Sequence, residues 1–372
     1  MGTPRPRSPR RLPEPRVPVI LVSGVEEGAM LSATISLHLG LPDAVMVRHI
    51  IDPERQLLTR VVSDLGGVIE HEEINLAHAC VACAIREDIV PTLERLAAQG
   101  RWGGIVACLP VAAEAIQVCR VLAWAPRMAP HISVAAVVAA LEATTVAEDL
   151  LGPALLAERG LATSEDDRRG VAEVGSAIVE YADVVCVTDR PEPEEESLIA
   201  TLAQPRTPVV TDPSLLDAAG LVVGVHRHHA VEAGVAEVRR NPLPPVPEGG
   251  AWRLDLRSER PIHPVRFQEE LEILGGGPRR SRGCFWVPTR PDDICVWDGA
   301  GGQASVGSTQ RWGRSDRLTR IVVVGIDDEA EQISQAFERA LLTDQEIARR
   351  GQIWEESWDG LEDWLGPIGR AA

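Results

Sequence analysis

Short apolar runs alternate with segments of helical periodicity between residues 17 and 225. The runs are rich in Val, Ile and Ala and contain few polar positions, which is typical of strands buried on both faces. They are VPVILVSG (17–24), AVMVRHII (44–51), GIVACLP (104–110), HISVAAVVAA (131–140), DVVCVTD (183–189), TPVVTD (207–212) and LVVGV (221–225). Helices are predicted at 32–39, at 112–122 and in a segment that ends near 181. Because strands separated by helices form a parallel sheet with both faces covered, residues 17–225 are predicted to fold as a doubly wound, mostly parallel α/β domain.

The pattern changes after residue 225. Residues 226–250 contain Pro, Gly and charge without apolar periodicity, and we predict a linker there. Between 251 and 350, strands at FWVPTR, DICVWD and RLTRIVVVGI and helices at 268–274 and 328–342 predict a second, smaller α+β domain. The basic, Pro-rich residues 1–16 are predicted to be a disordered tail.

The end of the chain, residues 351–372, is an acidic tail rich in tryptophan. Trp354, Trp358 and Leu361 fall on one face at helical spacing. Such a helix packs either against its own chain or against a partner protein, and the spacing leaves both interpretations open.

Composition excludes several functional classes. The chain has 372 residues, is 45% hydrophobic and carries a formal net charge of -18. This length supports two buried cores, whereas the acidity disfavours binding to phosphate backbones and to anionic lipid. No segment approaches the roughly 20 apolar residues that span a bilayer. The seven cysteines are odd in number and mostly lie in apolar runs, which is typical of reduced thiols. We therefore expect a cytoplasmic protein that binds neither nucleic acid nor membranes.

The strand at 17–24 and the helix after it have the position of a phosphate-binding loop. A working loop has the form G-x-x-x-x-G-K-[ST], in which the lysine neutralises the phosphates and the hydroxyl holds Mg²⁺. Gly24 and Gly28 are the candidate nucleotide-binding residues of this turn. If Gly24 is the first glycine of the motif, its lysine position falls on Met30 and its hydroxyl position on Leu31.

Charge makes phosphate binding at this turn unfavourable. Glu26 and Glu27 lie where phosphates would sit, and all 37 basic residues of the chain are arginine. One carboxylate at ~4 Å from a phosphate oxygen costs on the order of 4 kcal/mol at an effective dielectric constant of about 20. The sequence therefore predicts that binding of GTP with Mg²⁺ is lost or weak.

Two stretches resemble the CobW family of metal-handling GTPases. In HACVACAIREDIVPTLERL (78–96), Cys80 and Cys83 match the outer cysteines of a C-x-C-C motif, and Ala82 replaces the middle one. The segments ERPIHPVRFQEEL (259–271) and SRGCFWVPTRPDDICVWDGAGG (281–302) resemble that family's C-terminal domain. The resemblance implies a P-loop NTPase-like domain followed by a CobW C-terminal domain. It also implies delivery or balancing of a transition metal, usually zinc or cobalt, and hence a metal-requiring client protein as partner.

Other nucleotide motifs of that family are missing. Residues 107–110 replace its E-x-x-G-like segment, and Thr188, Asp189, Arg190 and Pro191 replace its guanine-reading N-K-x-D. We therefore expect a CobW-like metal-homeostasis protein with lost or impaired GTP hydrolysis. Two alternatives stay open: a weak GTPase in which Arg86 or Arg190 substitutes for lysine, and an interaction scaffold that binds neither metal nor nucleotide.

The pair Cys80 and Cys83 has the C-x-x-C spacing of zinc thiolates. Zinc prefers four ligands, and His78 and Glu73 are the candidates that would complete the site. The alternative is that both cysteines are small residues in a turn. A second candidate is the cluster at 226–229, HRHH, because imidazoles suit Zn, Ni or Co, although a solvated surface run explains it equally simply.

Overall fold

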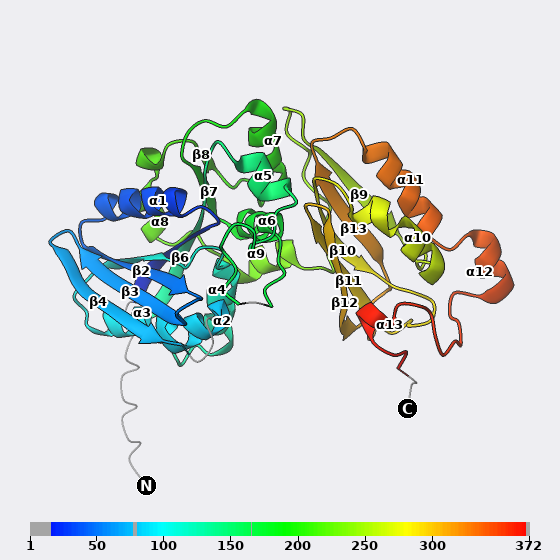
Figure 1. Cartoon of the computed structure of the whole chain (residues 1–372), viewed down its shortest axis with the longest axis horizontal. Coiled ribbons are helices and arrows are strands. Elements are labelled where there is room, and N and C mark those ends of the chain that lie inside the picture. Colours follow the sequence, from blue (N-terminus) through cyan, green and yellow to red (C-terminus); the bar gives the residue numbers. More distant parts are fainter. Residues whose placement is uncertain (1–15, 77–79, 165, 370–372) are drawn as a thin grey trace, which may run out of the picture.

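The computed structural model describes residues 16–76, 80–164 and 166–369. The chain forms two sheets that lie side by side, each with its own helices (Figure 1). The first sheet belongs to the amino-terminal part of the chain and has eight strands, and the second has five.

The first sheet is mostly parallel. Its strands are β1 (Val17–Gly24), β2 (Ala44–Asp52), β3 (Leu57–Asp64), β4 (Gly67–Asn75), β5 (Gly104–Cys108), β6 (Ile132–Leu141), β7 (Val184–Val187) and β8 (Val209–Val210). They follow the order β4-β3-β2-β5-β1-β6-β7-β8. The six neighbouring strands β2, β5, β1, β6, β7 and β8 pair in parallel. Strand β3 runs antiparallel to both β2 and β4. The predicted doubly wound, mostly parallel fold is therefore confirmed.

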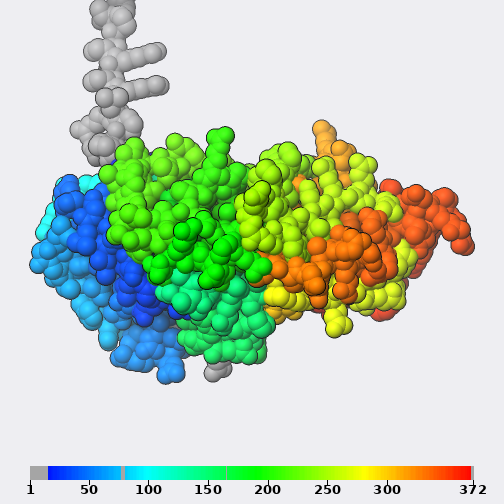
Figure 2. Space-filling view, turned by 90° about the horizontal axis from the view of Figure 1, so that it is seen from above, coloured from blue at the N-terminus to red at the C-terminus, as the bar shows by residue number. Residues whose placement is uncertain are grey.

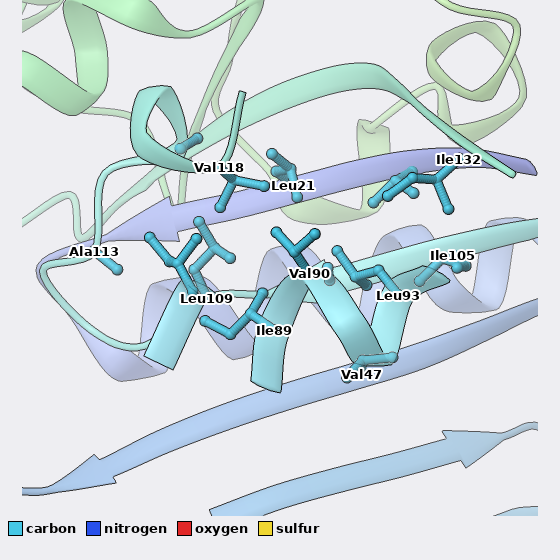
Figure 3. Close-up of a cluster of buried hydrophobic side chains, with 14 of the residues drawn as sticks. Leu21, Val47, Ile89, Val90, Leu93, Ile105, Leu109, Ala113, Val118 and Ile132 are labelled. Carbon is cyan, nitrogen blue, oxygen red and sulfur yellow. The ribbon is translucent and has the colours of Figure 1, made fainter. Parts of the chain in front are cut away.

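Helices cover both faces of this sheet. They are α1 (Glu27–Gly40), α2 (Val81–Ala84), the π-helical turn η1 (Ile85–Ile89), α3 (Val90–Ala98), α4 (Ala115–Trp124), α5 (Val146–Leu151), α6 (Val171–Tyr181), α7 (Pro193–Leu202), the 3₁₀ turn η2 (Pro213–Leu215), α8 (Ala218–Val222) and α9 (His228–Val235). Ile20 and Val22 of β1 pack in one core with Leu37 of α1. Leu21 of the same strand packs on the opposite face with α3 and α4, and Val90 lies below it in the close-up view (Figure 3).

Two elements of this part differ from the prediction. The run LVVGV, predicted to be a strand, lies in α8 and the turn after it, because Asp217 caps a helix by accepting a hydrogen bond from the Gly220 amide (2.9 Å). The antiparallel strand β3 and the edge strand β4 were not predicted at all. Most of β4 is exposed, so its charged residues hide the strand signal.

The second sheet is antiparallel throughout, and helices cover one of its faces. Its elements are β9 (Trp252–Ser258), α10 (Pro264–Gly275), β10 (Arg279–Phe285), β11 (Asp293–Ala300), β12 (Gln303–Arg311), β13 (Thr319–Gly325), α11 (Ala330–Ala340), α12 (Asp344–Arg350) and α13 (Glu362–Leu365). The strand order is β12-β11-β10-β13-β9. Phe267 of α10 and Phe337 of α11 pack onto Trp297 of β11 in one buried core. This arrangement of strands and helices is the predicted smaller α+β unit.

The predicted linker and the predicted tail are more ordered than their composition suggests. Residues 226–250 contain α9, which packs on α6. The tail forms no long helix and follows an irregular path, with Trp354 and Leu361 buried and Trp358 72% exposed. Its tryptophans therefore do not share one face, and the tail packs against its own chain.

The two sheets are held together by a polar contact and an apolar one. Glu180 in α6 pairs with Arg280 and Arg282 of β10. Ala251 and Val324 lie in the same buried cluster as helices α5 to α7. In the space-filling view the green amino-terminal part and the yellow-to-red carboxy-terminal part touch along one side (Figure 2).

Candidate functional site

The turn between β1 and α1 is too short to enclose phosphates. The strand ends at Gly24 and the helix begins at Glu27, so only Val25 and Glu26 lie between them. A Cβ atom on Gly24 would lie 2.5 Å from the Ala140 carbonyl oxygen and 2.9 Å from the Met30 Cγ atom. Gly24 is therefore required for packing against β6 and α1. A Cβ atom on Gly28 would meet nothing within 4 Å, so no packing constraint requires a glycine there.

Met30 stands where the lysine of a working loop would be. Its side chain is 1% exposed and belongs to the core between β1 and α1. A buried thioether offers neither charge nor a hydrogen-bond donor to a phosphate. This position therefore contributes packing rather than phosphate binding.

Both acidic side chains of the turn already have cationic partners. Glu26 pairs with Arg159, which also pairs with the buried Asp149. Glu27 pairs with Arg48 of β2. Burial raises the pKa of Glu26, and the Arg159 charge opposes that rise. Each carboxylate of the turn is therefore neutralised by an arginine of the same chain.

A cavity of about 520 Å³ lies at the carboxyl ends of β1, β2 and β5. In a doubly wound sheet this edge is where ligands bind. Its polar lining comes mainly from the ion-paired residues Glu26, Glu27, Arg48 and Arg159. Because both arginines are paired with carboxylates and no ammonium is present, these residues do not fit a nucleoside triphosphate with Mg²⁺.

The arginines considered as substitutes for lysine lie elsewhere. Neither Arg86 nor Arg190 lines this cavity, and both are exposed. Sequence reasoning missed Arg48 and Arg159, which do line it. The segment that replaces N-K-x-D is tied to the end of β6, because the Thr188 hydroxyl donates to Glu142 Oε1 (2.9 Å).

The predicted thiol pair is brought together at the start of α2. Cys80 is the N-cap residue of this helix, and its Sγ atom accepts a hydrogen bond from the Cys83 amide at 3.0 Å. Both cysteines are partly exposed. The hydrogen bond with Cys80 raises the pKa of the Cys83 thiol to about 11, with burial adding to the rise. Two adjacent, accessible sulfurs are what a C-x-x-C site for zinc requires.

A buried charge network fixes the segment that carries these thiols. Asp88 lies in η1, one turn beyond Cys83. Its carboxylate accepts hydrogen bonds from His49 (3.0 Å) and Thr92 and forms an ion pair with Arg60. Burial raises the pKa of Asp88, but the His49 hydrogen bond and the neighbouring positive charges outweigh it and hold the pKa below its usual range. Since His49 and Arg60 belong to β2 and β3, the network anchors η1 to the sheet.

The two residues expected to complete the thiol site have different outcomes. Glu73 lies on the exposed strand β4, where its carboxylate is 3.6 Å from Arg55. Among the described residues, no group of three potential metal ligands includes Cys80 and Cys83, so Glu73 is not brought to them. His78 lies outside the described residues.

The HRHH cluster is only partly a surface run. His226 is buried and His228 is partly buried at the start of α9, whereas Arg227 and His229 are more exposed. Tyr181 of α6 lies against the imidazoles of His226 and His228. Within the described ranges, no helix is long and apolar enough to cross a membrane.

Comparison with known proteins identifies a domain in the carboxy-terminal part of the chain. Residues 252–341 match the family model of the cobalamin synthesis protein cobW C-terminal domain. The chain is 27% identical to a zinc chaperone of Mycobacterium tuberculosis, and the match covers 94% of both chains. It is 19% identical to zinc-regulated GTPase metalloprotein activator 1 of Dictyostelium discoideum, over 79% of this chain and 70% of that protein.

A solved structure is also similar. The Zn(II)-bound YjiA GTPase from E. coli is 17% identical, with a TM-score of 0.34, and the match covers 88% of this chain and 99% of that chain. Residues 252–341 thus form a cobW C-terminal domain, and over most of its length the chain is similar to a mycobacterial protein that is named as a zinc chaperone.

Proposed function

We propose that this chain is a CobW-type metal-homeostasis protein that holds zinc for a metal-requiring client and does not hydrolyse GTP by the lysine-dependent mechanism. The absence of lysine-dependent GTP hydrolysis is inferred from the turn at Glu26, where carboxylates and a buried methionine stand in the place of phosphate-binding groups. The names of two relatives, a zinc chaperone and a zinc-regulated GTPase activator, support the first half.

A triphosphate would have to break existing interactions to bind in this cavity. Arg159 would leave Asp149, whose side chain is 1% exposed, and Glu26 would be left facing the phosphates. Breaking a buried ion pair, such as that of Arg159 with Asp149, costs about 3–5 kcal/mol. The contact between Glu26 and the phosphates, which carry the same charge, adds several kcal/mol. The ion pairs therefore oppose nucleotide binding as well as failing to assist it.

Zinc capture would begin at Cys80 and Cys83. Their sulfurs are adjacent, partly exposed and held on a segment that the Asp88 network fixes to the sheet. Remaining coordination positions would be filled by side chains near this turn, by water or by a thiol of the client. An incomplete ligand set suits a protein that must release its metal, because an exchange partner needs an open position.

Zinc analysis of the purified chain tests this proposal. We expect equilibrium dialysis to show one zinc equivalent that is lost in the Cys80→Ala/Cys83→Ala double variant. The variant Cys186→Ser is the matched control, because Cys186 is a buried thiol in a strand between β6 and β8. Equal zinc binding by the native chain and the double variant would refute the assignment.

A weak GTPase is the second candidate, and the size of the cavity favours it. About 520 Å³ at the carboxyl edge of the sheet leaves room for a nucleotide if Arg48 and Arg159 exchange their carboxylate partners for phosphates. Saturable, Mg²⁺-dependent binding of a fluorescent GTP analogue would support this candidate over the first.

A further inference from the structure

A second group of potential metal ligands lies near the beginning of β6, at the amino-terminal ends of the parallel strands, opposite to the cavity at their carboxyl ends. Cys119 comes from the middle of α4, His228 is the first residue of α9, and His226 lies two residues before it. The amides of Val225 and His226 both donate to the Ala135 carbonyl oxygen (2.7 and 2.8 Å), which holds this segment beside the beginning of β6. The Cys80 pair and the β1–α1 turn, in contrast, follow the carboxyl ends of their strands.

The ligand atoms converge on one point. One such atom from each of Cys119, His226 and His228 lies within 4.8 Å of the other two. The hydroxyl of Tyr181 lies 2.7 Å from His228 Nδ1 and 3.4 Å from His226 Nε2, so both imidazole nitrogens face the same small space. A thiol and two imidazoles are ligands that zinc and other borderline-soft divalent ions prefer.

The opposite nitrogen of each imidazole is held by a carboxylate. His226 Nδ1 lies 2.9 Å from Asp183 Oδ2, and the same oxygen accepts a hydrogen bond from the Val137 amide. His228 Nε2 lies 3.4 Å from Glu232. The hydrogen bond with Asp183 fixes the tautomer of His226, so that its Nε2 lone pair points toward the shared space. The Glu232 carboxylate favours the corresponding tautomer of His228, whose Nδ1 faces the same space.

A solvent path reaches this space. A cavity of about 250 Å³ is lined by the three candidate ligands, by His229, by Arg16 and Ser133, and by apolar residues such as Ile132 at the beginning of β6. The thiol and both imidazoles thus border a volume that could admit an ion with its remaining water.

We propose that Cys119, His226 and His228 form a second binding site for a divalent d-block cation, best suited to Zn²⁺, with the fourth position open to the cavity. On binding, the Cys119 S–H bond breaks, its proton leaves to solvent, and sulfur donates its electron pair to the metal. The Tyr181 hydroxyl gives up its contacts with the two imidazoles. This site goes beyond the proposed function and shares no residue with the Cys80 pair.

Cobalt binding to the full chain carrying Cys80→Ala and Cys83→Ala tests the proposal. We expect one equivalent of Co²⁺ with a near-ultraviolet sulfur-to-metal charge-transfer band, and competition by Zn²⁺. The band should disappear in C119S, and H228A should weaken binding by at least about 10–100-fold, a range that ligand-shell changes typically give. D183N should weaken binding without removing the band.

Controls separate loss of a ligand from loss of the fold. C186S removes another buried thiol and should retain the band. His228 is only partly buried, so H228A should keep the native circular dichroism spectrum and decides the question if C119S does not fold. Absence of any band in the Cys80→Ala/Cys83→Ala chain, or a band that persists in C119S or depends on His229 instead, would overturn the proposal. None of these three results bears on zinc binding by the Cys80 pair, because the Cys80→Ala/Cys83→Ala chain lacks that pair.

Discussion

At the scale of single residues, packing and ion pairs account for each side chain of the turn between β1 and α1. Without any lysine in the sequence, the position that would carry the ammonium holds Met30, which is almost fully buried. Gly24 remains because β6 and α1 approach it closely. The carboxylates of the turn gain their partners from Arg48 and Arg159, so the turn is electrostatically satisfied without a bound anion.

The first prediction concerns Arg159. Replacing it with methionine keeps much of the volume but leaves Asp149 buried without its cation. We expect Arg159→Met to lower the free energy of unfolding by on the order of 3 kcal/mol, measured by urea denaturation at pH 7. Arg55→Met is the control, because the pair of Arg55 with Glu73 is exposed on both sides. Equal effects of the two substitutions would contradict the role given to Arg159.

Sequence reasoning located the turn with its two carboxylates and its methionine, but not the arginines that pair with the carboxylates. The lost lysine and the two carboxylates are local features, readable from a few consecutive residues. Arg48 and Arg159 lie 21 and 133 residues away from their partners, and only the fold brings them together. The same limit applies to Cys119, which is far in sequence from His226 and has no spacing signal that links them.

At the scale of secondary-structure elements, the carboxy-terminal tail shows why helical spacing alone misled the prediction. Gly351, Gly360 and Gly366 adopt φ values of 79°, 80° and 70°, which break the chain into short turns and allow only α13 to form. Trp354 and Leu361 are still buried, as packing positions would be, whereas Trp358 is 72% exposed. Periodicity predicted their burial but not the conformation that achieves it.

The second prediction concerns the anchor of this tail. Asp359 pairs with Arg290 (3.0 Å) and accepts a hydrogen bond from Thr289, and the Asp359 and Arg290 side chains are almost inaccessible. We expect Asp359→Asn to weaken the anchor and to accelerate limited proteolysis between residues 351 and 369. The matched change Asp363→Asn, at an exposed position of α13, should leave the rate unchanged. A tail that is cleaved equally fast in both variants would show that the pair does not hold it.

The first sheet illustrates a second limit at this scale. Its parallel strands β1, β5 and β6 are apolar almost throughout and were predicted, because burial on both faces disfavours polar residues. The edge strand β4 carries the sequence GVIEHEEIN and is mostly exposed, so it has no apolar run. Its pairing with β3 depends on main-chain hydrogen bonds, which leave no pattern in the side chains.

At the scale of the whole molecule, a buried charge cluster couples the two sheets. Glu180 at the end of α6 pairs with Arg280 and Arg282 across the contact. Burial raises the pKa of Glu180, but the charges of these arginines outweigh it and lower the pKa to about 2. The cluster therefore stabilises the folded state only while Glu180 is ionised.

The third prediction is the pH dependence of this contact. Because the pKa of Glu180 in the folded state lies below its value of 4.5 in an unfolded chain, its stabilisation is complete above pH 4.5 and is lost as the pH falls toward 2. The shift corresponds to on the order of 3 kcal/mol. We expect the stability difference between the native chain and Glu180→Gln, measured by urea denaturation, to shrink from pH 5 to pH 2.5.

Glu196→Gln serves as the control for this series, since Glu196 is exposed on α7. Its difference from the native chain should stay small and constant over the same range of pH. A Glu180→Gln difference that does not change with pH would contradict the coupling of the two sheets by this charge.

The most direct test of the account is a titration of the purified chain with a fluorescent GTP analogue in the presence of Mg²⁺, followed by a GTP turnover assay. A CobW-type protein with an intact G-x-x-x-x-G-K-[ST] loop is the positive control. Because Glu26 and Glu27 lie where phosphates would sit and Met30 stands at the lysine position, we predict no saturable binding at micromolar nucleotide and no turnover above the uncatalysed rate. Saturable, Mg²⁺-dependent binding with turnover comparable to the control would contradict the account.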